Sequence, residues 1–194
     1  MYKRQILKDT YHLEGRQVLL FVGRLIDIKN LFFLLDAFAL VVKRYPKAIL
    51  LFVGDGDQRE ALERHAERNG LANHVIFAGK KQGEDLYACY NIGQIFVLPS
   101  YYERFGAVVN EALLAGCYTL CSVVAGAACL IEPRKNGDLF DPASKTDLAE
   151  KLAEGLEDCE GLRQISLKAN KMGYSYDQYL SLIHISEPTR LRCI

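Results

Sequence analysis

Short apolar runs alternate with amphipathic or helix-forming segments along most of the chain. The predicted strands are the strand-sized apolar runs at residues 17–23, 48–53, 75–77, 95–98, 118–122 and 137–140. The predicted helices are residues 31–44, a charged helix that ends at Asn69-Gly70, and residues 84–91, 107–115, 144–158 and about 161–176. Strand–helix repetition with short connections implies an α/β fold with a doubly wound parallel sheet.

Composition and charge fit one soluble α/β domain. The chain has 194 residues, half of them apolar, which is enough to bury a sizeable core. Lys and Arg total 24, as do Asp and Glu, so bulk charge does not favour a nucleic acid partner. The longest apolar runs are far shorter than a transmembrane segment, and no apolar region follows Met1-Tyr2-Lys3-Arg4 as a signal peptide requires.

The cysteines favour structural thiols over a metal site. Six are present, at positions 89, 117, 121, 129, 159 and 193, and they form no C-x-x-C pair. Cys117 and Cys121 lie among apolar residues, so we expect buried, reduced thiols of a cytoplasmic protein and no bound metal.

Two carboxylates seven residues apart mark the most informative segment. Glu103 and Glu111 follow the predicted strand 95–98 and flank a Phe-Gly turn with an apolar helix start. A helix that begins near Gly106 would point its free N–H groups at the strand end, which makes an anion site. The carboxylates would lie at most roughly 12 Å apart, a spacing that suits the two hydroxyl-bearing ends of a nucleotide-sugar. The alternative is a surface glutamate followed by an ordinary helical one.

A basic pair follows the first predicted strand. Arg24 and Lys29 lie in the loop after residues 17–23, at the carboxyl edge where doubly wound sheets bind ligands. Two fixed cations there would stabilise the charge that grows on a diphosphate leaving group. A solvated pair of surface cations is the alternative from these residues alone.

The segment from Pro99 to Gly116 resembles the E-x7-E signature of glycosyltransferase family 4, the retaining transferases of GT-B fold. The resemblance extends from Gln17 to Tyr179, and Arg104 departs from it because a small residue is commoner there. It implies that the chain is the Rossmann-like, donor-binding C-terminal half of such an enzyme. The expected reaction is retaining transfer of a hexosyl group from a nucleotide-diphospho-sugar, without a metal or other cofactor. A GT-B nucleotide-sugar epimerase and a non-catalytic nucleotide-binding module stay as alternatives.

The resemblance also implies roles for individual residues. Glu103 would contact the transferred sugar and Glu111 the ribose hydroxyls, while the G-R-L…K pattern would place two cations on the diphosphate. The residues expected to act in catalysis are Arg24, Lys29 and Glu103. The residues expected to bind the donor are Gly23, Lys80, Lys81, Phe105, Gly106, Ala107 and Glu111. Lys80 and Lys81 are expected beside the base, with solvated surface lysines as the alternative.

Two glycine-containing turns are less specific. Gly54-Asp55-Gly56 lacks the third glycine of a dinucleotide fingerprint, because Arg59 stands there, and it follows the second strand. It is similar to the family's V-G-D-G turn, which is structural or close to the ligand. Residues 124–128 resemble a looser form of a glycine-rich turn that opens another helix.

The two ends of the chain are interpreted separately from the domain. Residues 1–16 are expected to be a leading segment, 17–160 the nucleotide-sugar-binding domain, 161–179 a C-terminal helix, and 180–194 a non-native tail translated from a sequencing adapter. The resemblance implies a separate N-terminal domain that binds a glycan or glycolipid acceptor. It also associates such enzymes with polysaccharide biosynthesis in the cytoplasm, peripherally at the inner membrane face.

Overall fold

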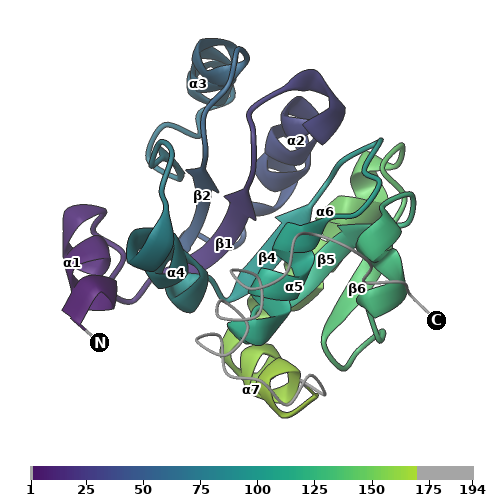
Figure 1. Ribbon diagram of the computed structural model, residues 1–194. Coiled ribbons are helices and arrows are strands. Elements are labelled where there is room, and N and C mark those ends of the chain that lie inside the picture. Colours follow the sequence, from purple (N-terminus) through teal and green to yellow (C-terminus); the bar gives the residue numbers. More distant parts are fainter. Residues whose placement is uncertain (1, 170–194) are drawn as a thin grey trace.

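The computed structural model describes residues 2–169 as a single layered α/β unit (Figure 1). Six parallel strands form one sheet in the order β3-β2-β1-β4-β5-β6. The strands are β1 Gln17–Val22, β2 Ala48–Val53, β3 Val75–Phe77, β4 Ile95–Leu98, β5 Tyr118–Ser122 and β6 Gly137–Phe140. The helices are α1 Tyr2–Thr10, α2 Leu31–Val41, α3 Arg59–Arg68, α4 Gly83–Ile92, α5 Ala107–Leu114, α6 Lys145–Glu157 and α7 Cys159–Ala169, with 3₁₀ turns η1 Asp27–Lys29 and η2 Gly126–Leu130. The prediction of a doubly wound parallel α/β fold is confirmed.

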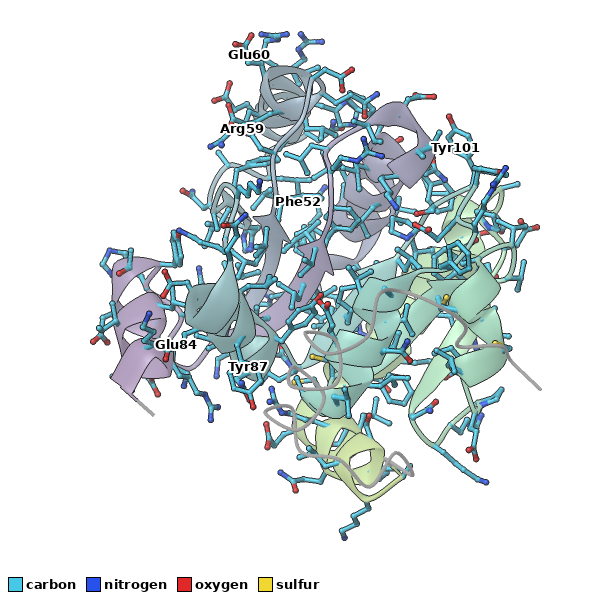
Figure 2. The ribbon with its side chains drawn as sticks, viewed as in Figure 1. Phe52, Arg59, Glu60, Glu84, Tyr87 and Tyr101 are labelled. Atoms are coloured by element: carbon cyan, nitrogen blue, oxygen red, sulfur yellow. The ribbon has the colours of Figure 1, made fainter. Side chains whose placement is uncertain are left out.

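Helices cover both faces of the sheet, which explains why its strands are apolar without alternation. One core cluster joins the sheet to α2, α3 and α6 through Leu34, Leu62 and Leu148. The other joins the opposite face to α4 and α5 through Ala88 and Ala112. Figure 2 places Phe52 on β2, where its fully buried ring stacks on Phe77. Every residue of β2 is buried, as the continuous apolar run predicts.

The strand order creates a switch point between β1 and β4. After β1 the chain crosses to β2 on one side, whereas after β4 it crosses to β5 on the other side. The connections after these two adjacent strands therefore diverge at their carboxyl ends, and we call the region between them the crevice. Open α/β sheets bind ligands in this crevice.

The helix α1 was not predicted, because residues 1–16 were interpreted as a leading segment. It is a mostly polar helix with few apolar positions, and Leu7 is its buried contact with the core. Lys3 pairs with Glu84 and Asp85 at the start of α4. The segment is too short and too polar for its periodicity to reveal a helix, and packing against α4 holds it in place.

Several predicted helix boundaries differ from the structure, most of them by a single residue. The helix α2 ends at Val41 and not at residue 44, because the turn that follows tightens into i→i−3 bonds, in which the N–H groups of Arg44 and Tyr45 donate to the carbonyls of Val41 and Val42. The turn at 124–128 leads only into the short η2, and α7 begins at Cys159 instead of 161. The predicted end of α7, and the tail at 180–194, lie outside the described residues.

Four of the five described cysteines agree with the structural interpretation, whereas Cys129 is exposed and disulfide-bonded. Cys89, Cys117, Cys121 and Cys159 are buried free thiols. Burial raises the pKa of Cys89 to about 11 and those of Cys117 and Cys121 to about 12, so these thiols stay protonated at neutral pH. Within residues 2–169 no three His, Cys, Asp or Glu side chains gather as a metal site would need, and no helix has the length and apolarity to cross a membrane.

Candidate functional site

The loops after β1 and β4 meet at the switch point. The Tyr101 backbone N–H donates to the Ile28 carbonyl at 3.2 Å, and the Tyr101 hydroxyl donates to the Asp27 carboxylate. Figure 2 shows Tyr101 at the side of the sheet where the strands end. These bonds hold the predicted basic loop against the loop that carries Glu103.

Lys29 and Glu103 form an ion pair in this crevice. The Lys29 ammonium donates to Glu103 Oε2, and the two side chains are only 14% and 17% exposed. The other oxygen, Glu103 Oε1, lies 3.4 Å from the Phe105 backbone nitrogen. The carboxylate of Glu103 therefore occupies a position between a cation and a backbone donor, where an external anion would also be stabilised.

Arg24 lies on the same loop as Lys29 but faces solvent. Its guanidinium has no hydrogen bond or ion pair with any part of the chain that the structure describes, and its side chain is exposed. Gly23, just before it, adopts a φ of 156°, and its N–H donates to the Val53 carbonyl at 3.0 Å. The hydrogen bond of Gly23 thus fixes the start of the loop, and the Arg24 guanidinium lies beside the crevice without a partner in residues 2–169.

The helix α5 begins at the same crevice. Gly106 caps it in the left-handed conformation with a φ of 75°, and a Cβ there would lie 2.9 Å from the Ala127 Cβ. Only glycine fits both constraints without strain. Ala107 and Phe105 are exposed beside it, Phe105 by 77% of its surface. The first-turn N–H groups of α5 and its positive dipole end therefore face the crevice.

Glu111 lies one turn further along α5. It accepts a hydrogen bond from the Tyr90 hydroxyl of α4 at 2.7 Å. Burial raises the pKa of the Glu111 carboxyl, and the Tyr90 bond offsets part of that rise. A partly desolvated carboxylate oriented by one hydroxyl is suited to accept further hydrogen bonds from a ligand.

The Gly54-Asp55-Gly56 turn is structural. A Cβ at Gly54 would overlap the Gly23 carbonyl oxygen, and one at Gly56 would overlap the Leu25 carbonyl. The Leu25 N–H donates to the Asp55 carbonyl at 3.0 Å. The two glycines let the β2 loop press against the β1 loop and so fix the position of the basic segment.

Lys80 and Lys81 stand apart from the ion pair at Lys29. They follow β3, which is two strands from β1 in the sheet. Lys80 is exposed, while the charge of Lys81 acts on Cys89 and Asp85 of α4. The structure thus places Lys81 near α4, on the side of the sheet that also carries Glu111.

Sequence reasoning missed two polar groups at this edge. The Tyr90–Glu111 bond joins two helices and has no local sequence signal. Ser100, directly after β4, is fully buried, and its hydroxyl has no hydrogen-bond partner within residues 2–169. Because buried hydroxyls usually have a partner, the Ser100 hydroxyl at this edge of the sheet can still form a hydrogen bond.

Comparison with known proteins agrees with this architecture. The family model described as glycosyl transferases group 1 matches residues 3–172. An uncharacterized glycosyltransferase of Methanocaldococcus jannaschii is 33% identical over 136 residues, which cover 70% of this chain and 35% of that protein. Mannosylfructose-phosphate synthase of Agrobacterium fabrum is 32% identical over 153 residues, covering 75% of this chain and 34% of that protein. The chain thus spans about a third of the length of these curated relatives.

Solved structures show the same fold. The Anabaena protein HepE, solved in complex with UDP, superposes with a TM-score of 0.77 at 26% identity, covering 87% of this chain and 46% of that one. The C-terminal domain of the LpcC protein from Francisella tularensis superposes with a TM-score of 0.74 at 21% identity and is covered over 92% of its length. The predicted likeness to the C-terminal half of a GT-B fold is therefore confirmed. With the family model matched over residues 3–172 and the switch-point crevice in place, the chain belongs to the group 1 glycosyl transferases.

Proposed function

We propose that this domain binds a nucleotide-diphospho-sugar donor at the β1–β4 switch point and serves retaining transfer of a hexosyl group. The observation that carries the proposal is the Lys29–Glu103 pair beside the start of α5. In it, a cation and the free N–H groups of a helix face one crevice. These groups match a diphosphate next to a sugar that offers hydroxyl donors.

Each residue then has a distinct part in binding. Arg24 and Lys29 hold the diphosphate, and the N–H groups of Phe105, Gly106 and Ala107 face the sugar and phosphate. Glu103 accepts hydrogen bonds from sugar hydroxyls once Lys29 has turned to the phosphate. Glu111 accepts hydrogen bonds from the ribose. Lys80 and Lys81, which follow β3, are proposed to lie beside the nucleotide base. Gly23 is proposed to contact the donor from the start of the β1 loop.

The chemistry requires little covalent participation by the protein. As the glycosidic bond breaks, negative charge grows on the departing diphosphate, and the two cations with the α5 dipole stabilise it more than the ground state. In the proposed retaining route the acceptor attacks on the face from which the diphosphate leaves, so no nucleophilic carboxylate is needed. The acceptor, a glycan or glycolipid, is proposed to reach this crevice from a second domain of the whole protein.

The relatives support a nucleotide ligand. HepE has been solved with UDP, with UDP and glucose, and with UDP-glucose. Its identity to this chain in these structures is 26% to 27%, and the superpositions cover 86% to 87% of this chain. For this chain we propose a nucleoside diphosphate of the same chemical class.

Calorimetric titration of this chain with UDP and with GDP tests the proposal. We expect one site for at least one of the two nucleotides, and addition of EDTA should leave its affinity unchanged. The reason is that Arg24, Lys29 and the α5 terminus already neutralise the diphosphate. A loss of binding in EDTA that Mg²⁺ restores would contradict this charge balance, and no binding of either nucleotide would contradict the proposed donor site.

Replacing Glu111 by glutamine separates binding from stability. Because burial raises the pKa of Glu111 in the folded state, ionisation above that pKa opposes folding, whereas below the unfolded pKa the group is neutral in both states. Glu111→Gln should therefore raise the free energy of unfolding at neutral pH, and this gain should vanish in acid. Nucleotide binding should weaken by about 1–3 kcal/mol, because the amide is a poorer acceptor for ribose hydroxyls.

Urea unfolding at pH 7 and pH 4, with calorimetric titration at pH 7, measures both effects. Glu67→Gln is the matched control, since Glu67 is exposed on α3, away from the crevice. Unchanged nucleotide affinity in Glu111→Gln would remove Glu111 from the site.

A further inference from the structure

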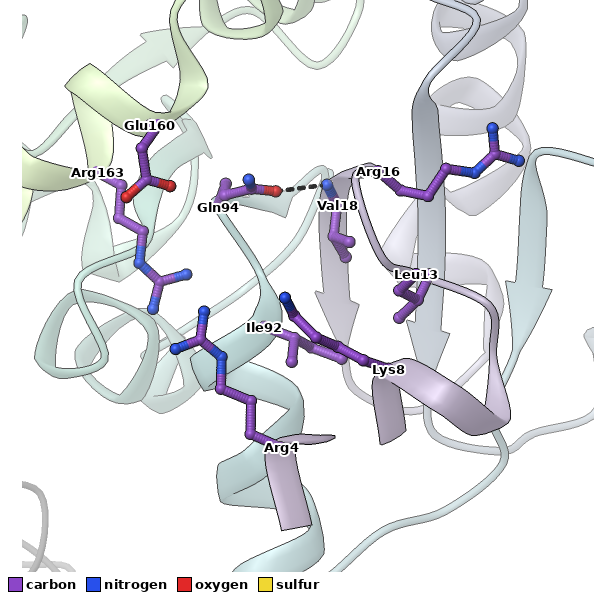
Figure 3. Close-up of a pocket in the computed structure, with 9 residues that line it drawn as sticks. All are labelled: Arg4, Lys8, Leu13, Arg16, Val18, Ile92, Gln94, Glu160 and Arg163. Atoms are coloured by element: carbon purple, nitrogen blue, oxygen red, sulfur yellow. Dashed lines mark hydrogen bonds between the residues drawn. The ribbon is translucent and has the colours of Figure 1, made fainter. Parts of the chain in front are cut away.

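A small cavity lies at the amino-terminal edge of the sheet, opposite the proposed donor site (Figure 3). Its volume is about 40 Å³, and its walls come from α1, from the residues that precede β1 and β4, and from α7. This is more than the ~10–15 Å³ that one water requires and much less than a nucleotide needs. The cavity therefore suits a small ion or the terminal group of a larger molecule.

Of the four cationic side chains that line this cavity, three converge on it. Arg4 and Lys8 lie one turn apart on α1, and Arg163 comes from α7. Figure 3 shows the guanidinium groups of Arg4 and Arg163 pointing toward one another, with the Lys8 ammonium nearby. Like charges placed this close repel one another unless a negative charge lies between them.

Arg163 is anchored without a carboxylate. It is buried, with 8% of its surface exposed, and its guanidinium donates to the carbonyls of Gly93 at 2.5 Å, Asn91 at 3.0 Å and Ala115 at 3.2 Å. These bonds cap the carboxyl ends of α4 and α5 and fix the plane of the guanidinium. Three of its five N–H donors are thereby used, which leaves two for another partner.

The other cations have little local compensation. Arg4 has no hydrogen bond or ion pair with the described part of the chain. Within residues 2–169 Lys8 pairs only with Glu14, at 3.3 Å, and the Glu14 side chain is 74% exposed. Glu160 lines the cavity but accepts its hydrogen bond from Gln164 and lies beyond 4 Å of all three cations. A fourth cation, Arg16, also lines the cavity, and its guanidinium donates to the Pro46 carbonyl at 3.2 Å. The lining residues thus include four cations and one carboxylate, an excess of three positive charges.

Gln94 adds a neutral donor. Its Oε1 accepts from the Val18 N–H at 2.7 Å, which fixes the side-chain amide in the cavity wall. The Nε2 group has no partner within residues 2–169 and is free to donate. The wall therefore offers N–H donors from a rigid amide, two guanidinium groups and an ammonium.

We propose that this cavity is a second ligand site, which binds the oxyanion of a phosphate group. A phosphate dianion would offset most of this positive charge, and its oxygens match donors that approach from several sides. The group is either free inorganic phosphate or the phosphate of an anionic lipid headgroup. The site lies at the end of the sheet opposite the switch point and does not depend on the proposed donor function.

Phosphate-dependent stabilisation of the chain tests the site. The melting temperature is measured against inorganic phosphate at constant ionic strength, with chloride as the replaced anion, and the dissociation constant follows from the dependence. We expect Arg4→Ala to weaken phosphate binding about tenfold, the effect of losing one charge-assisted hydrogen bond. Arg68→Ala is the matched control, because Arg68 is exposed on α3 and equally unpaired. Arg4 is exposed, so its removal should not unfold the domain.

Cosedimentation distinguishes the two sources of phosphate. Vesicles of phosphatidylcholine with phosphatidic acid are compared with vesicles of phosphatidylcholine alone. Retention on the anionic vesicles that Arg4→Ala abolishes and Arg68→Ala preserves identifies a lipid headgroup, while an Arg4-dependent shift with inorganic phosphate alone identifies the free ion. The proposal is overturned if neither probe gives a response, if Arg4→Ala and Arg68→Ala respond equally, or if the response is lost in Lys29→Ala and kept in Arg4→Ala.

Discussion

Replacing Lys29 by alanine is expected to weaken nucleoside diphosphate binding by about 100-fold. The ammonium of Lys29 lies in a mostly buried position, so little water would screen its attraction to a diphosphate. Its loss also leaves the Glu103 carboxylate unpaired beside the ligand, and like charges then repel. Titration calorimetry of the variant with the nucleotide that the parent chain binds measures the effect.

The opposite change at the partner residue should have the opposite sign. Glu103→Gln keeps the shape of the side chain but frees the Lys29 ammonium, so UDP or GDP, which carry no sugar for Glu103 to contact, should bind more tightly. Lys47→Ala is the control for a lost charge, because Lys47 is an exposed residue next to the amino end of β2, away from the crevice. Equal affinities in Lys29→Ala and Lys47→Ala would show that Lys29 does not hold the diphosphate.

Replacing Gly54 by alanine is expected to lower the free energy of unfolding by about 4 kcal/mol or more, the range of severe core defects. The new Cβ would overlap the Gly23 carbonyl oxygen, and the φ of 147° is unfavourable for any other residue. The clash is with backbone, which cannot rotate away, so the β1 loop must move. We therefore also expect nucleotide binding to be lost in molecules that remain folded.

Gly70→Ala is the matched control for this substitution. Gly70 has a φ of 71° at the end of α3, but a Cβ there meets open space. It should lose only about 1–2 kcal/mol from backbone strain. Urea unfolding of the two variants and the parent chain separates the steric effect from the conformational one, and equal losses would mean that the contact between the β1 and β2 loops is not rigid.

The order of elements could be predicted from the sequence because it is encoded locally. The β2 strand illustrates this, since an uninterrupted run of six apolar residues is recognisable without knowing what covers it. The same holds for the cap of α5, where Gly106 marks the helix start. By contrast, α1 has few apolar positions and is stabilised by α4, which only the folded structure reveals.

The sequence could indicate which side chains meet at the switch point, but it could not indicate how they pair. The positions of Arg24, Lys29 and Glu103 after two strands placed them at one edge of a parallel sheet. That Lys29 and Glu103 would form an ion pair across 74 residues depends on the switch-point order of the strands. The bond from Tyr90 to Glu111 also connects separate helices, and no spacing rule signals it.

The basic cavity at the opposite edge had no sequence signal at all. Arg4 and Arg163 are far apart in the chain, and each is an ordinary helical arginine when taken alone. Only the packing of α1 and α7 at the amino-terminal ends of the strands brings them to one cavity. A cluster of charges that comes from distant helices is therefore recognised in the folded structure and not in the composition of the sequence.

A crystal structure of this chain with UDP, or with GDP if that is the nucleotide it binds, tests the central claim most directly. We predict the diphosphate between Arg24 and Lys29 at the start of α5, the ribose against Glu111, and Lys29 turned from Glu103 to the phosphate. A nucleotide that lies elsewhere on the molecule, or one bound at this crevice while the Lys29–Glu103 pair remains closed, would contradict it.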